Sequence, residues 1–190
     1  MASHAKLPTS AAGCCGRRAG RSRVPSQAII DFDFGWPPTS AAGAIPRVET
    51  RISIARGAAD VFAYVTTPAL WHTWHPATAS VHDVPNRPLV TGETMRERIN
   101  AAGRRFDAIW TVLACEAPQL WVIATATDNG DARIVYRVTA TGEGCEFHRT
   151  LEFRSRHYPW RAFDGNVTRW ILDRQSARAL ANLKAVLERS

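Results

Sequence analysis

The sequence predicts an α+β fold in which a curved antiparallel sheet of six to seven strands wraps around one long C-terminal helix. Two observations lead to this prediction. Between residues 93 and 153, segments of alternating apolar and polar residues are separated by turn signals such as the DNGD of residues 128–131, as in consecutive antiparallel strands. Between residues 159 and 188, apolar residues recur mostly three, four or seven positions apart, which is the period of an amphipathic helix.

Ahead of these strands, the chain predicts one further strand and two short helices. Residues 48–54 alternate between apolar and polar side chains, which indicates a half-buried strand. Residues 57–65 place three apolar side chains on one helical face. Thr67 and Pro68 then offer an N-cap and a proline first turn for a second short helix over residues 69–74.

Five strands are expected in the second half of the chain, with short connections between them. Their predicted ranges are 93–100, 106–114, 120–127, 133–139 and 145–153, and a further short strand is expected between residues 78 and 83. Short connections make the sheet antiparallel, with one face wet and the other dry. Such a sheet curves around the helix, and an apolar cavity can form where the two diverge.

The first 46 residues differ in composition from the rest of the chain. They contain five Pro, five Gly and five Ser and show no sustained hydrophobic period. A segment of this kind cannot offset the entropy lost on ordering. We therefore predict a disordered N-terminal extension over residues 1–46 and a ligand-binding domain over residues 47–190. Composition leaves open that the extension is an organelle transit peptide or an over-extended gene start.

The charge of the chain does not indicate a nucleic-acid partner. The net charge is +7, of which +3 belongs to residues 1–46 and +4 to the rest. Arginine outnumbers lysine 22 to 2, but no basic helix and no RNA-binding aromatic motif is present. The chain also lacks a run of about 18 apolar residues, so no transmembrane segment is expected.

The four cysteines favour a reducing compartment, and we expect a cytoplasmic location. They lack the paired C-x-x-C spacing of a zinc module, and two of them, Cys14 and Cys15, lie in the predicted extension. Cys115 and Cys145 fall in predicted strands, where we expect small buried apolar residues.

Over residues 47–189 the sequence resembles the START-like or SRPBCC superfamily, whose helix-grip fold also occurs in birch-pollen-allergen-like proteins. The polyketide cyclase/dehydrase and lipid-transport branch is the most similar. The resemblance is carried by the opening strand of residues 48–54, the phrase GAADVFAYVTTPALWHTWHP of residues 57–76, residues 91–93 (TGE) ahead of a strand, and the closing ALANLKAVLE of residues 179–188. It implies a pocket between the closing helix and the concave face of the sheet, with no metal and no cofactor.

On each strand, the face with the larger apolar side chains is expected to point toward the pocket, and this predicts which residues line it. We expect a ligand to meet side chains from the sheet, the closing helix and the two short helices: Phe106, Trp110, Tyr136, Phe147 and Leu151; Phe163, Val167, Trp170 and Ile171; and Trp71 and Trp74. The last two are expected at the pocket entrance, on a mobile element. So many aromatic residues facing one helix suit a flat or polycyclic ligand. The alternative is that they only fill a core.

Two charged residues fall on strand faces that are otherwise apolar. Arg149 lies between Phe147 and Leu151, and Glu97 lies between Met95 and Ile99. A buried charge requires a partner, so Arg149 could hold a ligand carboxylate, phenolate or enolate. Glu97 could accept a proton or orient Arg149. The alternatives are that the two charges form a buried ion pair or that a bulge turns either one to solvent.

Two further polar features have both a functional and a structural interpretation. The hydroxyl of Tyr136 could donate to a ligand carbonyl, or it could be satisfied by the backbone in a core. His72 and His75 form an H-x-x-H pair, with His82 following. Two histidines at this spacing on a helix can share a metal, but no third ligand can be identified, and we expect them to surround the pocket entrance.

These features support three hypotheses. The first is a non-catalytic carrier or sensor that holds a lipid, a quinone or an aromatic polyketide in an internal cavity. The second is a metal-free cyclase or dehydratase that uses the same cavity, with Arg149, Glu97 and Tyr136 as catalytic candidates. The third is a protein-interaction module of the co-chaperone or toxin kind, which would show a packed interior and an exposed apolar patch. The oligomeric state cannot be predicted from the sequence.

Overall fold

The computed structural model describes residues 45–189, so the predicted extension over residues 1–46 lies outside the described residues except for its last two positions. The elements in chain order are β1 (Arg47–Ile54), α1 (Ala58–Val65), the 3₁₀ helix η1 (Pro68–Thr73), β2 (Thr78–His82), β3 (Thr94–Ala101), β4 (Arg104–Glu116), β5 (Leu120–Thr127), β6 (Gly130–Thr141), β7 (Gly144–Ser155), α2 (Trp160–Phe163), the π-helical turn η2 (Asp164–Thr168) and α3 (Arg169–Arg189).

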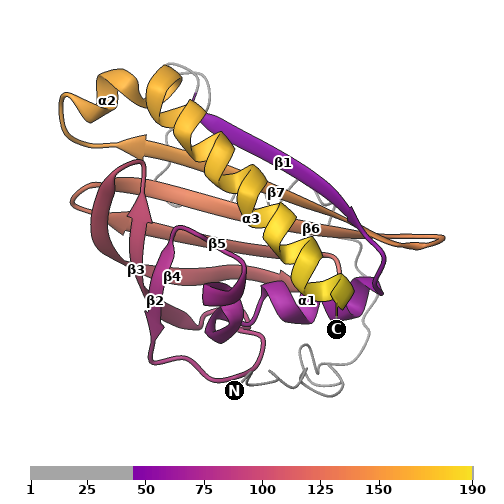
Figure 1. Ribbon diagram of the computed structural model, residues 1–190. Helices are drawn as coiled ribbons and strands as arrows, with labels where there is room; N and C mark the ends of the chain where they lie inside the picture. The colour runs from indigo at the N-terminus through magenta and orange to yellow at the C-terminus, as the bar shows by residue number, and fades with distance from the viewer. Residues whose placement is uncertain (1–44, 190) are drawn as a thin grey trace, which may run out of the picture.

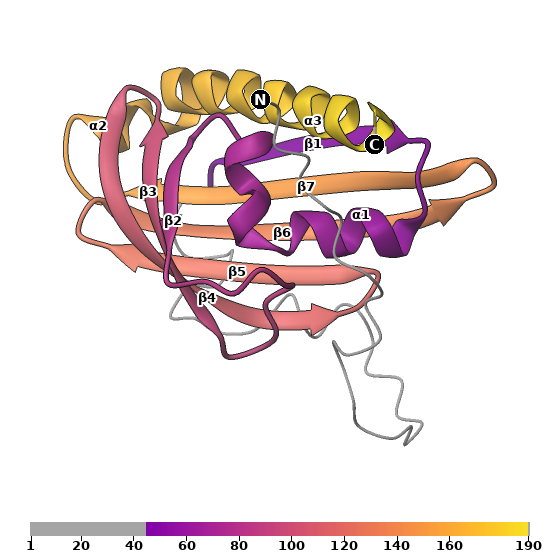
Figure 2. The ribbon, with the colours of Figure 1, turned by 60° about the horizontal axis from the view of Figure 1, so that its bottom comes forward.

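The seven strands form one antiparallel sheet in the order β1-β7-β6-β5-β4-β3-β2. Consecutive strands from β2 to β7 are neighbours, and β1 adds to the far edge by pairing with β7. The sheet is strongly curved, and α3 crosses its concave side diagonally (Figure 1). Helix α1 lies on the same side, near the C-terminal end of α3 (Figure 2). The structure therefore confirms the predicted helix-grip arrangement of a sheet wrapped around a closing helix.

Alternation along the strands places their apolar side chains in the core, as predicted. On β7, every second residue from Cys145 to Phe153 is buried. On β4 the alternation continues as far as Val112, after which the register with β5 shifts and Cys115 becomes the buried residue. A shift of this kind adds one residue to a strand and moves the following side chains to the other face.

The closing helix begins differently from the prediction. The chain turns through α2 and the π-helical η2 before α3 begins, and the buried residues of this turn are Asp164 and Thr168. The Asp164 carboxylate accepts hydrogen bonds from the Ser155 backbone N–H at 2.6 Å and the Ser155 hydroxyl at 2.8 Å. This polar anchor directs Asp164 toward the sheet, so the apolar residues of the same turn face outward.

The expectation that Phe163, Val167 and Trp170 face the sheet is therefore wrong. Their exposed fractions are 47%, 53% and 57%. Ile171 is only half-buried. Further along α3 the buried face consists of Ser176, Ala179, Leu180, Leu183 and Leu187. This is the face that holds the helix against the sheet.

The short helices are also confirmed, with one correction at Thr67. Pro68 occupies the first turn of η1, but Thr67 makes no side-chain cap for that helix. Its hydroxyl donates instead to the Ala63 carbonyl of α1 at 2.7 Å. The threonine therefore completes the end of the first helix rather than the start of the second.

Candidate ligand-binding site

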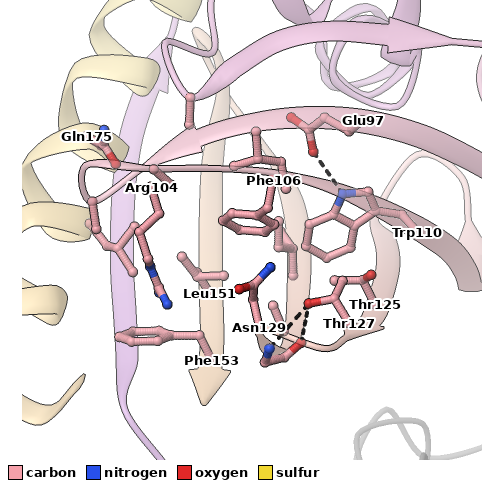
Figure 3. Close-up of a pocket in the computed structure, with 18 of the residues that line it drawn as sticks. Glu97, Arg104, Phe106, Trp110, Thr125, Thr127, Asn129, Leu151, Phe153 and Gln175 are labelled. Carbon is pink, nitrogen blue, oxygen red and sulfur yellow. Dashed lines mark hydrogen bonds between the residues drawn. The ribbon is translucent and has the colours of Figure 1, made fainter. Parts of the chain in front are cut away.

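A cavity of about 120 Å³ lies between the concave face of the sheet and the first turns of α3. Its apolar walls come from both halves of the sheet and from the helix: Trp71, Ile99, Phe106, Trp110, Ile134, Leu151, Phe153 and Leu172. Figure 3 shows Phe106, Leu151 and Phe153 pointing into this space. The cavity opens at the hairpin tips, where Asn129 is exposed and Thr127 and Arg104 are half-buried.

The inner end of the cavity contains the buried guanidinium of Arg149. This residue is 3% exposed. Its Nη1 donates to the Ser176 hydroxyl of α3 at 2.8 Å, and its Nη2 lies 3.5 Å from the His75 Nε2. The guanidinium is also hydrogen-bonded to the Tyr136 hydroxyl. Its Nε has no hydrogen-bond partner in the described part of the chain, so a buried cation is held by neutral groups only.

Glu97 is the second buried charge and is also 3% exposed. Its Oε1 accepts a hydrogen bond from the Thr78 hydroxyl at 2.5 Å, and its Oε2 accepts one from the Trp110 indole at 2.8 Å (Figure 3 shows the latter). Burial raises the pKa of Glu97 to about 7, although both hydrogen bonds and the charge of Arg149 oppose this shift. Glu97 can therefore gain or lose a proton near neutral pH.

Thr78 connects Glu97 to His75. The Thr78 hydroxyl lies 3.1 Å from the His75 Nδ1. Because this hydroxyl has one hydrogen and gives it to an ionised Glu97, His75 must donate from Nδ1. The Nε2 of His75 then carries a lone pair directed at Arg149. Burial, and secondarily the charge of Arg149, lowers the pKa of His75 to about 3, which keeps the imidazole neutral.

Aromatic packing fixes the wall beside these polar groups. The Tyr136 ring stacks on Trp121, with centroids 5.5 Å apart, and meets the edge of Phe147 at 5.2 Å. Burial raises the pKa of Tyr136 to about 12, with its hydrogen bond to Arg149 opposing the shift. The hydroxyl therefore remains a neutral donor beside the cavity.

The structure brings together most of the predicted strand residues. Phe106, Trp110, Tyr136, Leu151, Arg149 and Glu97 all line the cavity. Phe147 is fully buried behind Tyr136 and does not line it. Glu97 and Arg149 do point inward, but the predicted alternative of a direct ion pair between them is not found among residues 45–189.

The prediction that Trp71 and Trp74 surround the entrance is wrong. They are 2% and 1% exposed. Trp71 donates from its indole to the Val65 carbonyl at 2.8 Å and lines the inner part of the cavity. Trp74 packs against the rings of Tyr136 and His75 and does not line the cavity. Both are fixed in the core because η1 packs against β2, α1 and α3.

The histidines do not gather as a metal site would require. His75 lines the cavity, whereas His72 is exposed and contacts the Ala69 carbonyl. His82 is exposed and bonds Ser80. Over the residues that the structure describes, no three His, Cys, Asp or Glu side chains cluster closely enough to hold a metal ion.

The sequence reasoning missed Thr78 and Ser176, which complete the inner site. Ser176 could have been found by the signal that identified Arg149: it is a polar residue within the apolar face formed by Leu172, Ala179, Leu180 and Leu183. Thr78 begins the short strand β2, and no periodic pattern marks it. Only the pairing of β2 with β3 places it beside Glu97.

A curved seven-stranded sheet closed by a long helix over a polar-ended cavity defines a helix-grip domain of the START-like class. A family model described as "Polyketide cyclase / dehydrase and lipid transport" matches residues 46–188. The chain therefore belongs to this family, whose fold binds hydrophobic ligands. No curated protein sequence matches the chain significantly. No helix of residues 45–189 combines the length and the hydropathy needed to span a bilayer.

Solved structures from several bacteria share the fold. The Zhui aromatase/cyclase from Streptomyces sp. R1128 is 14% identical, with a TM-score of 0.63 over 75% of this chain and 93% of that one. A START superfamily protein from Mycobacterium smegmatis is 13% identical, with a TM-score of 0.61 and coverage of 75% and 97%. A protein from Rhodobacter sphaeroides is 18% identical, with a TM-score of 0.59 and coverage of 77% and 95%. At these identities the likeness concerns the fold alone.

Proposed function

We propose that this protein binds a hydrophobic small molecule in the cavity beneath α3, as a carrier or sensor. The observation that supports this most directly is the cavity itself, whose surface is mostly apolar with a small number of polar groups. A site built in this way takes an apolar body and orients it by a few polar contacts. Arg149 and Tyr136 are the groups that would set the orientation.

The size of the cavity limits what it can enclose. Its volume of about 120 Å³ is somewhat below that of an engineered cavity of roughly 150 Å³ that takes up benzene. A single ring or a short alkyl chain fills this space, and a polycyclic or lipid ligand would extend through the opening. Burying roughly 200 Å² of apolar surface contributes about 5 kcal/mol at roughly 25 cal/mol per Å².

A cavity-filling substitution tests the proposal. Ala132 is half-buried on β6 and lines the cavity, so a phenylalanine there occupies ligand space. Ala140 lies on the same strand but is exposed and outside the cavity. N-phenyl-1-naphthylamine, a neutral fluorescent probe, should bind the wild type and Ala140→Phe and bind Ala132→Phe at least about tenfold more weakly, a loss of about 1.4 kcal/mol. Equal binding by all three proteins would contradict the proposal.

Native mass spectrometry provides an independent check on the same proposal. The protein purified from its own host should carry a co-purifying small molecule, which would also identify the ligand.

The second candidate function is a cyclase or dehydratase that uses the same cavity. The His75–Thr78–Glu97 chain favours it, because the His75 Nε2 lone pair could take a proton from a bound substrate and pass one through Thr78 to Glu97. Arg149 would stabilise the oxyanion that forms. Product formation from a poly-β-keto substrate should then fall strongly in Glu97→Gln and Arg149→Gln. Unchanged turnover in both variants would exclude these residue roles.

The interaction-module hypothesis has weaker support, because the interior is not fully packed. Its other requirement is an exposed apolar surface, and Phe163, Val167 and Trp170 are exposed apolar residues. Deleting these side chains should leave probe binding unchanged if the cavity is the functional site. We also propose a cytoplasmic location, because Cys145 is a free, buried thiol and a reducing compartment keeps thiols unpaired. Fractionation of the host cells tests it.

A further inference from the structure

The charge of Arg149 is not balanced by any direct ionic partner in the described chain. The guanidinium contacts Ser176, Tyr136 and His75, and all three are neutral at physiological pH. Burying a cation without a counter-ion costs several kcal/mol, and arginine cannot avoid this cost by losing its proton. The guanidinium therefore lacks an anion in direct contact.

The unsatisfied donor of Arg149 belongs to a pair that suits a carboxylate. Nε has no acceptor, and the contact between Nη2 and the His75 Nε2 is long, at 3.5 Å. These two nitrogens form one edge of the guanidinium fork, which binds the two oxygens of a carboxylate in parallel. The residue lines a cavity whose surface is mostly apolar. A ligand that satisfies both features has an apolar body and a carboxylate head.

Among the described residues at this end, Glu97 is the only other group whose charge can change near neutral pH. The side chains that face it are Thr78 from β2, Trp110 from β4 and, across the cavity, His75, Tyr136 and Arg149. His75 and Tyr136 stay neutral, so Arg149 is the only fixed charge among them. A ligand carboxylate that binds Arg149 places a second anion near Glu97, and two anions in one buried space favour protonation of one of them.

The hydrogen-bond chain accommodates this proton without leaving a polar atom unpaired. When Glu97 is protonated, it can donate to the Thr78 oxygen, and the Thr78 hydroxyl can then donate to the His75 Nδ1, over the same contacts of 2.5 and 3.1 Å. The imidazole must then carry its hydrogen on Nε2. In total, one proton from solvent binds the His75 Nε2, one moves from the His75 Nδ1 to the Thr78 oxygen, and one moves from the Thr78 hydroxyl to Glu97. His75 thereby changes from an acceptor into a second donor for the carboxylate.

From this geometry we propose that the ligand is an apolar carboxylic acid, bound as its anion between Arg149 and His75, and that Glu97 takes up one proton as it binds. This inference rests on the proposed ligand-binding function and specifies the ligand class and its proton linkage. The His75–Thr78–Glu97 chain acts as a positioning and proton-storing device. The apolar walls hold the rest of the acid.

Isothermal titration of the full-length protein with 3-phenylpropanoate and 3-phenylpropanamide tests the proposal, since the two probes differ only in the head group. The carboxylate should bind at least about tenfold tighter than the amide at pH 6.5. Titrations in buffers of different ionisation enthalpy should show proton uptake that rises from near zero at pH 6 to most of one proton at pH 8. Affinity should fall about tenfold between pH 6.5 and pH 8.5.

Variants separate the roles of the two charges. Glu97→Gln should bind the carboxylate without proton uptake and with no pH dependence, whereas Glu116→Gln, an exposed glutamate outside the cavity, should behave as the wild type. Arg149→Gln should lose the preference for the acid, and Arg105→Gln, its exposed counterpart on β4, should keep it. In ¹⁵N-histidine-labelled wild type at pH 8, where free Glu97 is ionised, the ligand should move the hydrogen of His75 from Nδ1 to Nε2.

The outcomes distinguish this proposal from the function on which it rests. Equal binding of acid and amide, or binding of the acid without proton uptake at pH 8, overturns the proposal and leaves the cavity-binding function intact. So does failure of both probes when N-phenyl-1-naphthylamine still binds. If the neutral fluorescent probe also fails to bind, both proposals fall. The comparison of acid with amide uses the wild type alone, so it remains decisive even if Arg149→Gln does not fold.

Discussion

Replacing Glu97 with glutamine should change how the stability of the ligand-free protein depends on pH. The pKa of Glu97 is raised from its ordinary 4.5 to about 7 by burial. Because the folded state holds the proton more tightly than the unfolded state, this group stabilises the fold fully below pH 4.5. That contribution declines as the pH rises and is lost above about pH 7. Ionised Glu97 therefore acts against folding.

The expected magnitude follows from the size of the shift. A displacement from 4.5 to about 7 corresponds to about 3 kcal/mol at roughly 1.4 kcal/mol per pH unit. Since Glu97 is 3% exposed, solvent screening does not reduce this estimate greatly. Glutamine can imitate the protonated acid, with its carbonyl oxygen accepting from Trp110 and its amide donating to Thr78.

Urea unfolding monitored by tryptophan fluorescence between pH 5 and pH 9 measures the effect. The free energy of unfolding of Glu97→Gln minus that of the wild type should rise by about 3 kcal/mol over this range, mostly below pH 7.5. Taking the difference removes the contribution of His75, which both proteins share. Glu116→Gln should run parallel to the wild type. A difference for Glu97→Gln that is constant with pH would refute the reasoning.

Three further predictions concern stability. The free energy of unfolding of the wild type minus that of His75→Gln should fall by up to about 3 kcal/mol between pH 6.5 and pH 4, because folding lowers the pKa of His75 to about 3 and acid favours the protonated unfolded chain. Taking the difference removes the opposite contribution of Glu97, which both proteins share. Equal acid sensitivity of the two proteins would contradict this. In chemical unfolding, Trp121→Ala should lower the free energy of unfolding by about 3–5 kcal/mol, because Trp121 is fully buried. Trp170→Ala should lower it by less than about 1 kcal/mol, because Trp170 is 57% exposed. Similar losses in the two variants would show that the helix face is assigned wrongly. Asp164→Asn should lower the free energy of unfolding by about 2 kcal/mol in thermal or urea unfolding, because one of the two donors of Ser155 loses its acceptor. An unchanged unfolding midpoint would exclude a stabilising role for the contact between Asp164 and Ser155.

The strands could be predicted because burial on one face of a sheet imposes a period of two that the sequence records directly. The same period revealed Glu97 and Arg149 as charges on apolar faces, and both are buried. What the period cannot show is the partner of each charge. Thr78 and His75 reach Glu97 through the turn between η1 and β2 and the pairing of β2 with β3, and this depends on tertiary structure.

The start of the closing helix was mispredicted for a related reason. A helical period identifies an apolar stripe but assumes that the stripe is buried. At residues 163–170 one buried carboxylate, Asp164, satisfies two donors of Ser155, and this fixes the rotation of the helix against the apolar preference of its neighbours. The π-helical turn adjusts the rotation before α3 resumes with Leu172, Ala179 and Leu183 facing inward. Hydrophobicity alone could not have revealed this exception.

The inner end of the cavity is difficult to explain as a stabilising feature of the fold. Apolar residues of similar volume in place of a buried arginine and a buried glutamate are often neutral or stabilising, and Glu97 and Arg149 do not form a direct ion pair that would offset their desolvation. The polar groups between the two charges are Thr78 and His75, whose hydrogen bonds can reverse direction. A network with two hydrogen-bond patterns over the same contacts permits a change of protonation without structural rearrangement. The arrangement is therefore better explained by the binding of an external anion than by the stability of the ligand-free protein.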